Sequence, residues 1–274
     1  MSCYYPLIGL PRGIVSRLRY SSIPLNQQLR PGHRHGRHLL DLALYRPLED
    51  CWQCIERQPI PEAGDLELQS ETYGLSPGEL LVAVPLMRDS PHQQFPADLP
   101  PPASKRLDRA PVAERCSLSF RWRGIESSYQ GEYPLRMAER PGGTLVVFSP
   151  LLQSDACVQT NLVAVVTIAR RVDPTPHRLE GFEARSLCPI GQWDLRANAC
   201  TVVEITPQQA ATGELFFRCA TSLGIPICLS LSRDDLPPSL SVEHTHPPTE
   251  LFWEQDRLPG SRAIKGSWLG AALR

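Results

Sequence analysis

The side chains best suited to chemistry lie near the C-terminal end of the sequence. His244 and His246 are separated by one residue, and Glu250 follows after a Pro-Pro pair. Because side chains alternate along a strand, two imidazoles spaced in this way point to the same face of an extended segment. Imidazole nitrogens and carboxylate oxygens are ligands for transition metals. The pattern therefore predicts a divalent transition-metal site at His244, His246 and Glu250, as in a metal-dependent enzyme.

A second interpretation of the same residues is structural. The histidines of a strand end form local hydrogen bonds before the turn at Pro247 and Pro248. The spacing His-x-His-x-x-x-Glu resembles the first metal motif of cupins over these seven positions. That resemblance implies a further histidine in a second motif, but no histidine follows Glu250. The sequence is therefore not assigned to the cupins, and the structural interpretation is favoured.

Another cluster combines arginine and histidine. Its members are Arg30, His33, Arg34, His35, Arg37 and His38. Guanidinium groups offer forked donors to phosphate and other anions, so the cluster predicts an anion-binding loop of an accessory factor that contacts nucleic acid. A solvated loop is the favoured alternative. Lys+Arg 28 against Asp+Glu 29 argues against a general nucleic-acid binder without excluding local contact.

Aromatic and charged side chains gather in residues 122–136. The residues that we assign to a recognition surface are Trp122, Arg123, Tyr129, Glu132, Tyr133 and Arg136. Aromatic and arginine side chains are enriched where proteins bind partners, so this segment predicts contact with a protein partner. A strand with one solvated face would have the same composition.

Cys51 and Cys54 form a Cys-x-x-Cys pattern within Pro47–Gln58, which we expect to be a helix because Leu48, Trp52 and Ile55 recur at helical spacing. A zinc ribbon needs a second such pair, which the sequence lacks. Two buried core cysteines are the favoured interpretation.

Alternating or β-branched runs predict strands, for example at Ser117–Trp122, Leu162–Val172 and Ser239–His244. Between strands at Thr201–Ile205 and Ile225–Leu231, we expect a helix over Pro207–Leu223 and hence one βαβ unit. Short helices are also expected at three places: Leu39–Tyr45, Thr249–Arg257 and Ala263–Leu273. The predicted fold class is α+β, a mainly antiparallel sandwich- or barrel-like sheet with one embedded βαβ unit and a few short helices.

Proline is abundant, with Pro 28 in the chain, and it is concentrated in a stretch without apolar periodicity. We therefore expect an N-terminal Pro-rich mixed region at residues 1–89, a linker or long loop at 90–111, and a β-rich domain at 112–274. The apolar runs are too short to span a bilayer, and no export signal precedes them. Nine scattered cysteines are typical of reduced thiols, so we expect a soluble, cytoplasmic protein without membrane contact.

Three functions remain open at this point. A binding or interaction protein of unknown ligand is the favoured interpretation, because no complete catalytic motif is present. A metal-dependent enzyme and an anion-binding or nucleic-acid-contacting accessory factor are the alternatives. Whether the chain is an enzyme is left open, and so is its cofactor beyond the divalent metal.

Overall fold

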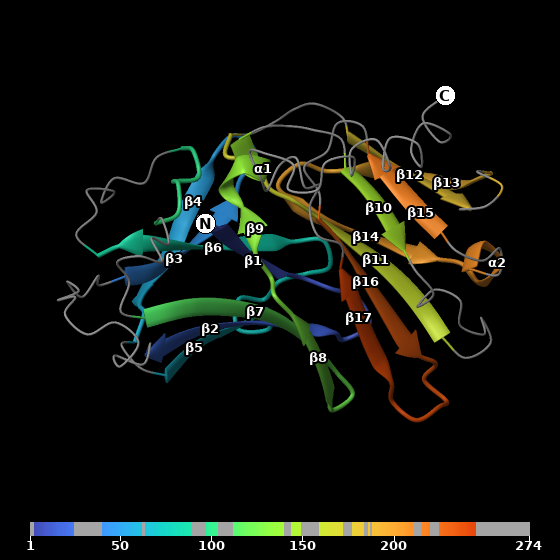
Figure 1. Cartoon of the computed structure of the whole chain (residues 1–274), viewed down its shortest axis with the longest axis horizontal. Coiled ribbons are helices and arrows are strands. Elements are labelled where there is room, and N and C mark those ends of the chain that lie inside the picture. Colours follow the sequence, from blue (N-terminus) through green and yellow to red (C-terminus); the bar gives the residue numbers. More distant parts are fainter. Residues whose placement is uncertain are drawn as a thin grey trace, which may run out of the picture.

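Antiparallel strands make up almost all of the computed structural model of the chain (Figure 1). The structure describes these residues: 3–24, 40–61, 64–88, 97–103, 112–139, 144–148, 159–171, 177–183, 186, 188–210, 215–219 and 225–244. Within them, the only helices are α1 (Leu135–Glu139) and α2 (Pro207–Ala210). Neither of these helices has the length or apolarity to cross a membrane.

The first half of the chain forms two sheets. Sheet I has the strand order β4-β3-β6-β1-β9, built from β1 (Cys3–Ile8), β3 (Leu40–Pro47), β4 (Trp52–Pro59), β6 (Leu80–Met87) and β9 (Tyr133–Pro134). Sheet II has the order β5-β2-β7-β8, built from β2 (Val15–Pro24), β5 (Gly64–Gln69), β7 (Val112–Trp122) and β8 (Ile125–Tyr129). The long pairing of β2 with β7 joins strands from both sides of residues 90–111 in one sheet.

The second half forms two further sheets. Sheet III has the order β14-β11-β16-β17, built from β11 (Gln159–Thr167), β14 (Ala199–Ile205), β16 (Ile225–Ser232) and β17 (Leu240–His244). Sheet IV has the order β10-β15-β12-β13, built from β10 (Thr144–Phe148), β12 (His177–Glu183), β13 (Pro189–Leu195) and β15 (Leu215–Cys219). Figure 1 shows sheets I and II on the left and sheets III and IV on the right, with β8 beside β17 where they meet.

The central strand β11 of sheet III is buried on both faces, which explains its unbroken apolar run. Leu162, Ala164 and Val166 belong to the same core cluster as the aromatic side chains of sheets I and II. Val163 and Val165 belong to a second cluster, which includes Phe217 of sheet IV. Because successive side chains of a strand point to opposite faces, one strand supplies both cores.

A segment of the proline-rich stretch crosses sheet I. The backbone N–H of Trp52 donates to the carbonyl of Ala97 (2.9 Å), and that of Leu99 donates to the carbonyl of Arg170 (2.9 Å). The side chain of Leu99 is buried. The Tyr4 hydroxyl donates to the carbonyl of Pro100 (3.1 Å). Residues 97–103 are therefore packed against the sheet and tie it to the end of β11.

The α+β prediction is wrong, because the described chain is almost entirely antiparallel sheet. The expected helix at Pro47–Gln58 is the edge strand β4 with the turn before it, and the expected helix at Leu39–Tyr45 is β3. Leu48 and Ile55 are exposed, at 46% and 36%, so the predicted apolar stripe is not buried on a common face.

The predicted βαβ unit is also wrong. Both β14 and β16 pair antiparallel with β11, which lies between them. The expected helix over Pro207–Leu223 is reduced to α2, and Leu215–Cys219 forms β15 in sheet IV instead. Leu215 and Cys219 are four residues apart, a spacing that places side chains on one side of a helix and equally on one face of a strand.

Candidate ligand pocket

Two tight turns with the sequence Arg-Gly lie at the junction between sheets II and III. Arg12 (φ 61°) and Gly13 (φ 68°) join β1 to β2, and the N–H of Ile14 donates to the carbonyl of Pro11 (3.2 Å). Arg123 (φ 47°) and Gly124 (φ 85°) join β7 to β8. Positive φ at both central residues is the signature of a type I′ turn, whose twist matches that of a hairpin.

The turn from β16 to β17 reaches the same place from the other half of the chain. Its ends are joined because the N–H of Ser239 donates to the Ser232 hydroxyl (2.9 Å), and the N–H of Leu236 donates to the carbonyl of Arg233 (3.1 Å). Arg233 and Asp235 form an ion pair across the turn (3.0 Å).

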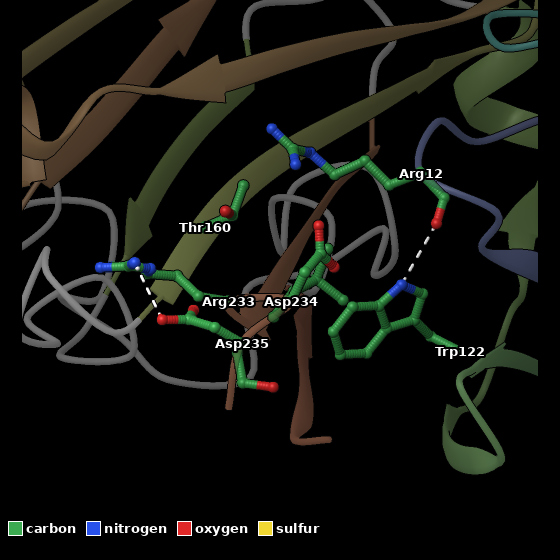
Figure 2. Close-up of a pocket in the computed structure, with 8 residues that line it drawn as sticks. Arg12, Trp122, Thr160, Arg233, Asp234 and Asp235 are labelled. Carbon is green, nitrogen blue, oxygen red and sulfur yellow. Dashed lines mark hydrogen bonds and ion pairs between the residues drawn. The ribbon is translucent and has the colours of Figure 1, made fainter. Parts of the chain in front are cut away.

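These turns border an open pocket of about 390 Å³, whose lining side chains are drawn in Figure 2. Its lining residues come from sheets II and III and from two turns: Arg12, Trp122, Thr160, Leu231, Ser232, Arg233, Asp234 and Asp235. Pockets that hold small molecules have volumes of roughly 300–1,000 Å³, so this pocket has the size for one.

Hydrogen bonds connect the walls of the pocket to one another. The indole Nε1–H of Trp122 donates to the carbonyl of Arg12 (3.2 Å). The Nη2 of Arg12 donates to both carboxylate oxygens of Glu204 in β14 (3.0 Å each), so the first turn is joined to sheet III. The guanidinium of Arg123 lies 5.2 Å from the centre of the Trp122 ring and contacts the carbonyl of Leu236 (3.4 Å).

The pocket holds two arginines and two aspartates, so its formal charges sum to zero. The charge of Arg12 is paired with Glu204, and that of Arg233 with Asp235. Asp234 is exposed and makes no hydrogen bond or ion pair with any other residue that the structure describes. Asp234 and Trp122 both line the pocket and are labelled in Figure 2. The arrangement can accept hydrogen bonds at Asp234 and donate them from the guanidinium and hydroxyl groups around it.

The predicted recognition residues are placed in different surroundings. Trp122 is buried at 4% and lines the pocket, and Arg123 is exposed beside it. Tyr129 stacks on Phe120 (6.3 Å between ring centres), and burial raises the pKa of its hydroxyl. Tyr133 is fully buried. Glu132 is half-buried, and of Arg136 only the backbone in α1 is described.

The predicted metal site lies almost wholly outside the described residues. The backbone of His244 ends β17, as expected for a strand, but its side chain, His246 and Glu250 are not described. Among the side chains that are described, no group of three or more histidine, cysteine, aspartate or glutamate residues could hold a metal ion. The arginine and histidine cluster at residues 30–38 also lies outside the described part.

The Cys-x-x-Cys pair lies at the start of an edge strand and not on a helix. Cys51 precedes β4, and the thiol of Cys54 contacts the carbonyl of Glu56 (3.4 Å). Burial raises the pKa of the Cys54 thiol, which opposes formation of a nucleophilic thiolate. Both side chains are half-buried, so they are neither core residues nor fully exposed.

Most pocket residues were not recognised in the sequence. Arg12, Thr160 and the Arg233-Asp234-Asp235 run belong to no established motif. The dipeptides Arg12-Gly13 and Arg123-Gly124 are the available signal, because a glycine between two apolar strands marks a turn.

No family model matches the chain, and no curated protein matches its sequence. The pocket therefore has to be interpreted from its own chemistry.

Proposed function

We propose that this chain is a binding protein and that its ligand, a small polar molecule, occupies the pocket between sheets II and III. The observation that carries the proposal is a pocket of ligand size whose walls come from distant parts of the chain and are joined by hydrogen bonds. Such cross-links hold the walls in place before a ligand arrives, which reduces the entropy lost on binding.

The chemistry of the walls supports binding more than catalysis. Two of the four charged lining residues, Arg12 and Arg233, are already paired with carboxylates. No lining residue is a histidine or cysteine, the side chains that most often act as a general base or as a nucleophile. Polar groups at fixed positions around an apolar wall are what orient a ligand.

The other two functions stay predictions. Their side chains, at His244, His246 and Glu250 and at residues 30–38, lie outside the part of the chain that the structure describes. The predicted cytoplasmic location also stays a prediction, and the seven described cysteines, which are all free thiols, are consistent with it.

The indole N–H of Trp122 provides a test, because it belongs to the pocket wall and gives its own NMR signal. The protein would be labelled with ¹⁵N, and this signal would be assigned among the five tryptophans with the variant Trp122→Phe. Mixtures of polar metabolites (amino acids, organic acids, amines, sugars and polyols) would then be titrated. We expect at least one compound to move the Trp122 signal in a saturable way.

A variant with a filled pocket and a matched surface variant complete the test. Thr160→Phe places a ring in the pocket and should abolish the response. Ser128→Phe adds the same ring at an exposed site on sheet II and should leave the response unchanged. A library that never moves the Trp122 signal, or a response that survives Thr160→Phe in a folded protein, would refute the proposal.

A further inference from the structure

We infer that the ligand is a neutral, polyhydroxylated molecule of the size of a monosaccharide or disaccharide. This inference rests on the proposed function, since it names the chemical class that the same pocket accepts. Three properties of the lining residues exclude the other classes in turn: the pairing of the arginines, the open carboxylate of Asp234, and the positive charges around the indole.

The pairing of the arginines disfavours an anionic ligand. Arg12 is bound by both oxygens of Glu204, and Arg233 by Asp235, each at 3.0 Å. A carboxylate or phosphate would have to displace these partners or share the guanidinium with them, and it would meet the negative charge of Asp234 nearby. Like charges at such distances repel, so an anion gains little net electrostatic energy here.

The open carboxylate of Asp234 favours a ligand with hydrogen-bond donors. It lines the pocket and has no partner among the described residues, while an ionised carboxylate offers only acceptor sites. Two neighbouring hydroxyl groups of a polyol can donate to its two oxygens. Hydrogen bonds to a charged group are stronger than those between neutral groups, so this contact would dominate binding.

A cationic donor is disfavoured by the surrounding arginines. Arg12 and Arg233 line the pocket, and the guanidinium of Arg123 lies 5.2 Å from the centre of the Trp122 ring, so an ammonium group would have three positive charges nearby. A neutral hydroxyl donor avoids this repulsion. It can also accept a hydrogen bond from an N–H group of Arg12 that the ion pair with Glu204 leaves unused.

The apolar part of the wall is small, because Trp122 and Leu231 are exposed at only 4% and 1%. The indole N–H of Trp122 is already bonded to the carbonyl of Arg12. The hydroxyls of a polyol would therefore contact mainly the polar part of the lining, at Asp234 and Thr160.

The experiment uses sugars that share one skeleton and differ in charge. Neutral glucose, galactose, mannose, maltose and lactose would be titrated against the full-length protein, with the Trp122 indole signal as the readout. Glucosamine and glucuronate are the cationic and anionic counterparts of glucose. We expect at least one neutral sugar to move the signal in a saturable way and to bind more tightly than either charged counterpart.

Asp234→Asn tests the carboxylate contact. We expect it to weaken binding of that neutral sugar about tenfold, because a hydrogen bond to a charged acceptor becomes one to a neutral amide. Asp194→Asn, at an exposed ion pair with Arg178 on sheet IV, is the matched control and should not change the affinity.

The outcomes separate the inference from the proposed function. If glucosamine or glucuronate binds more tightly, if only non-sugar metabolites bind, or if Asp234→Asn has no more effect than Asp194→Asn, the inference is wrong and the binding pocket stands. If no sugar and no member of the metabolite library moves the Trp122 signal, both fail.

Discussion

The hydroxyl of Tyr133 forms hydrogen bonds with both backbone polar groups of Ile168. The tyrosine hydroxyl donates to the carbonyl of Ile168 (3.1 Å) and accepts from its N–H (3.2 Å). Ile168 follows β11, so it has no strand partner in that ladder. The Tyr133 side chain therefore satisfies the backbone hydrogen bonds just after β11 of sheet III.

Tyr133→Phe should destabilise the protein by about 1–3 kcal/mol, because it leaves the N–H and the carbonyl of Ile168 buried without a hydrogen bond. The free energy of unfolding would be measured by guanidinium denaturation. Tyr73→Phe is the control, since the Tyr73 hydroxyl bonds the half-exposed Glu56 carboxylate (2.7 Å), which water can reach. Equal losses in the two variants would contradict this account.

Cys200 makes the stability sensitive to alkaline pH. Its side chain is buried in the core cluster to which sheets I, II and III contribute. This burial raises the pKa of the thiol from 9.0 to about 12. Below the unfolded pKa the thiol is neutral in both states, so its contribution to stability is complete. As the pH rises above this value, the unfolded chain loses the proton first, and stability falls until the folded pKa is reached.

Between about pH 8 and pH 10, the wild type should therefore lose about 1 kcal/mol more stability than Cys200→Ala. The comparison of the two losses removes the contributions of the buried tyrosines, which both proteins share. Urea unfolding at each pH provides the measurement. Parallel pH profiles for the two proteins would show that the thiol does not titrate in this way.

At the scale of elements, the two Arg-Gly turns decide where the pocket walls meet. A Cβ added at Gly124, where φ is 85°, would have no heavy atom within 4 Å. The cost of substitution there comes from the backbone conformation alone and not from a clash.

Gly124→Ala should therefore destabilise the protein by about 1–2 kcal/mol, the cost of a left-handed conformation for an ordinary residue. Gly124→Asn should cost less, because asparagine tolerates this conformation better. Thermal unfolding of the three proteins ranks them. If alanine proves as stable as glycine, the β7–β8 turn does not have the geometry described.

The whole molecule is held together by a core to which both halves of the chain contribute. Tyr5 and Leu7 of sheet I, Phe120 of sheet II and Leu229 of sheet III belong to one cluster. Residues 97–103 add a strap across sheet I. We therefore expect both halves to unfold together.

A protease site inserted between Ala103 and Val112 tests whether the segments before and after it form one folded unit. After cleavage, we expect the two fragments to co-elute on size exclusion, because the β2–β7 ladder and the common core hold them together. An uncut sample and a sample cleaved in denaturant are the controls. Two folded fragments that elute separately would favour the predicted division at residues 90–111 instead.

The local sequence pattern predicts strands correctly where polar and apolar residues alternate clearly. It fails where the spacing of apolar residues fits a helix and a strand equally well. Ser117–Trp122 alternates polar and apolar residues and lies within β7. Pro47–Gln58 was assigned to a helix on three apolar residues and a favourable first turn, but pairing with β3 made it a strand. Tertiary hydrogen bonding along a sheet edge outweighs such weak local preferences. Of the pocket, only Trp122 was among the predicted site residues.

The sequence by itself determined that the chain is rich in strands, because alternation and β-branched runs act between near neighbours and can be read from them. The tertiary structure decided which strands pair, that β11 lies between two cores, and that Arg12, Trp122 and Asp234 surround one pocket. These residues are far apart in the chain. Their proximity follows from the register of the sheets and from turns that bring distant strands together, which no short stretch of sequence encodes.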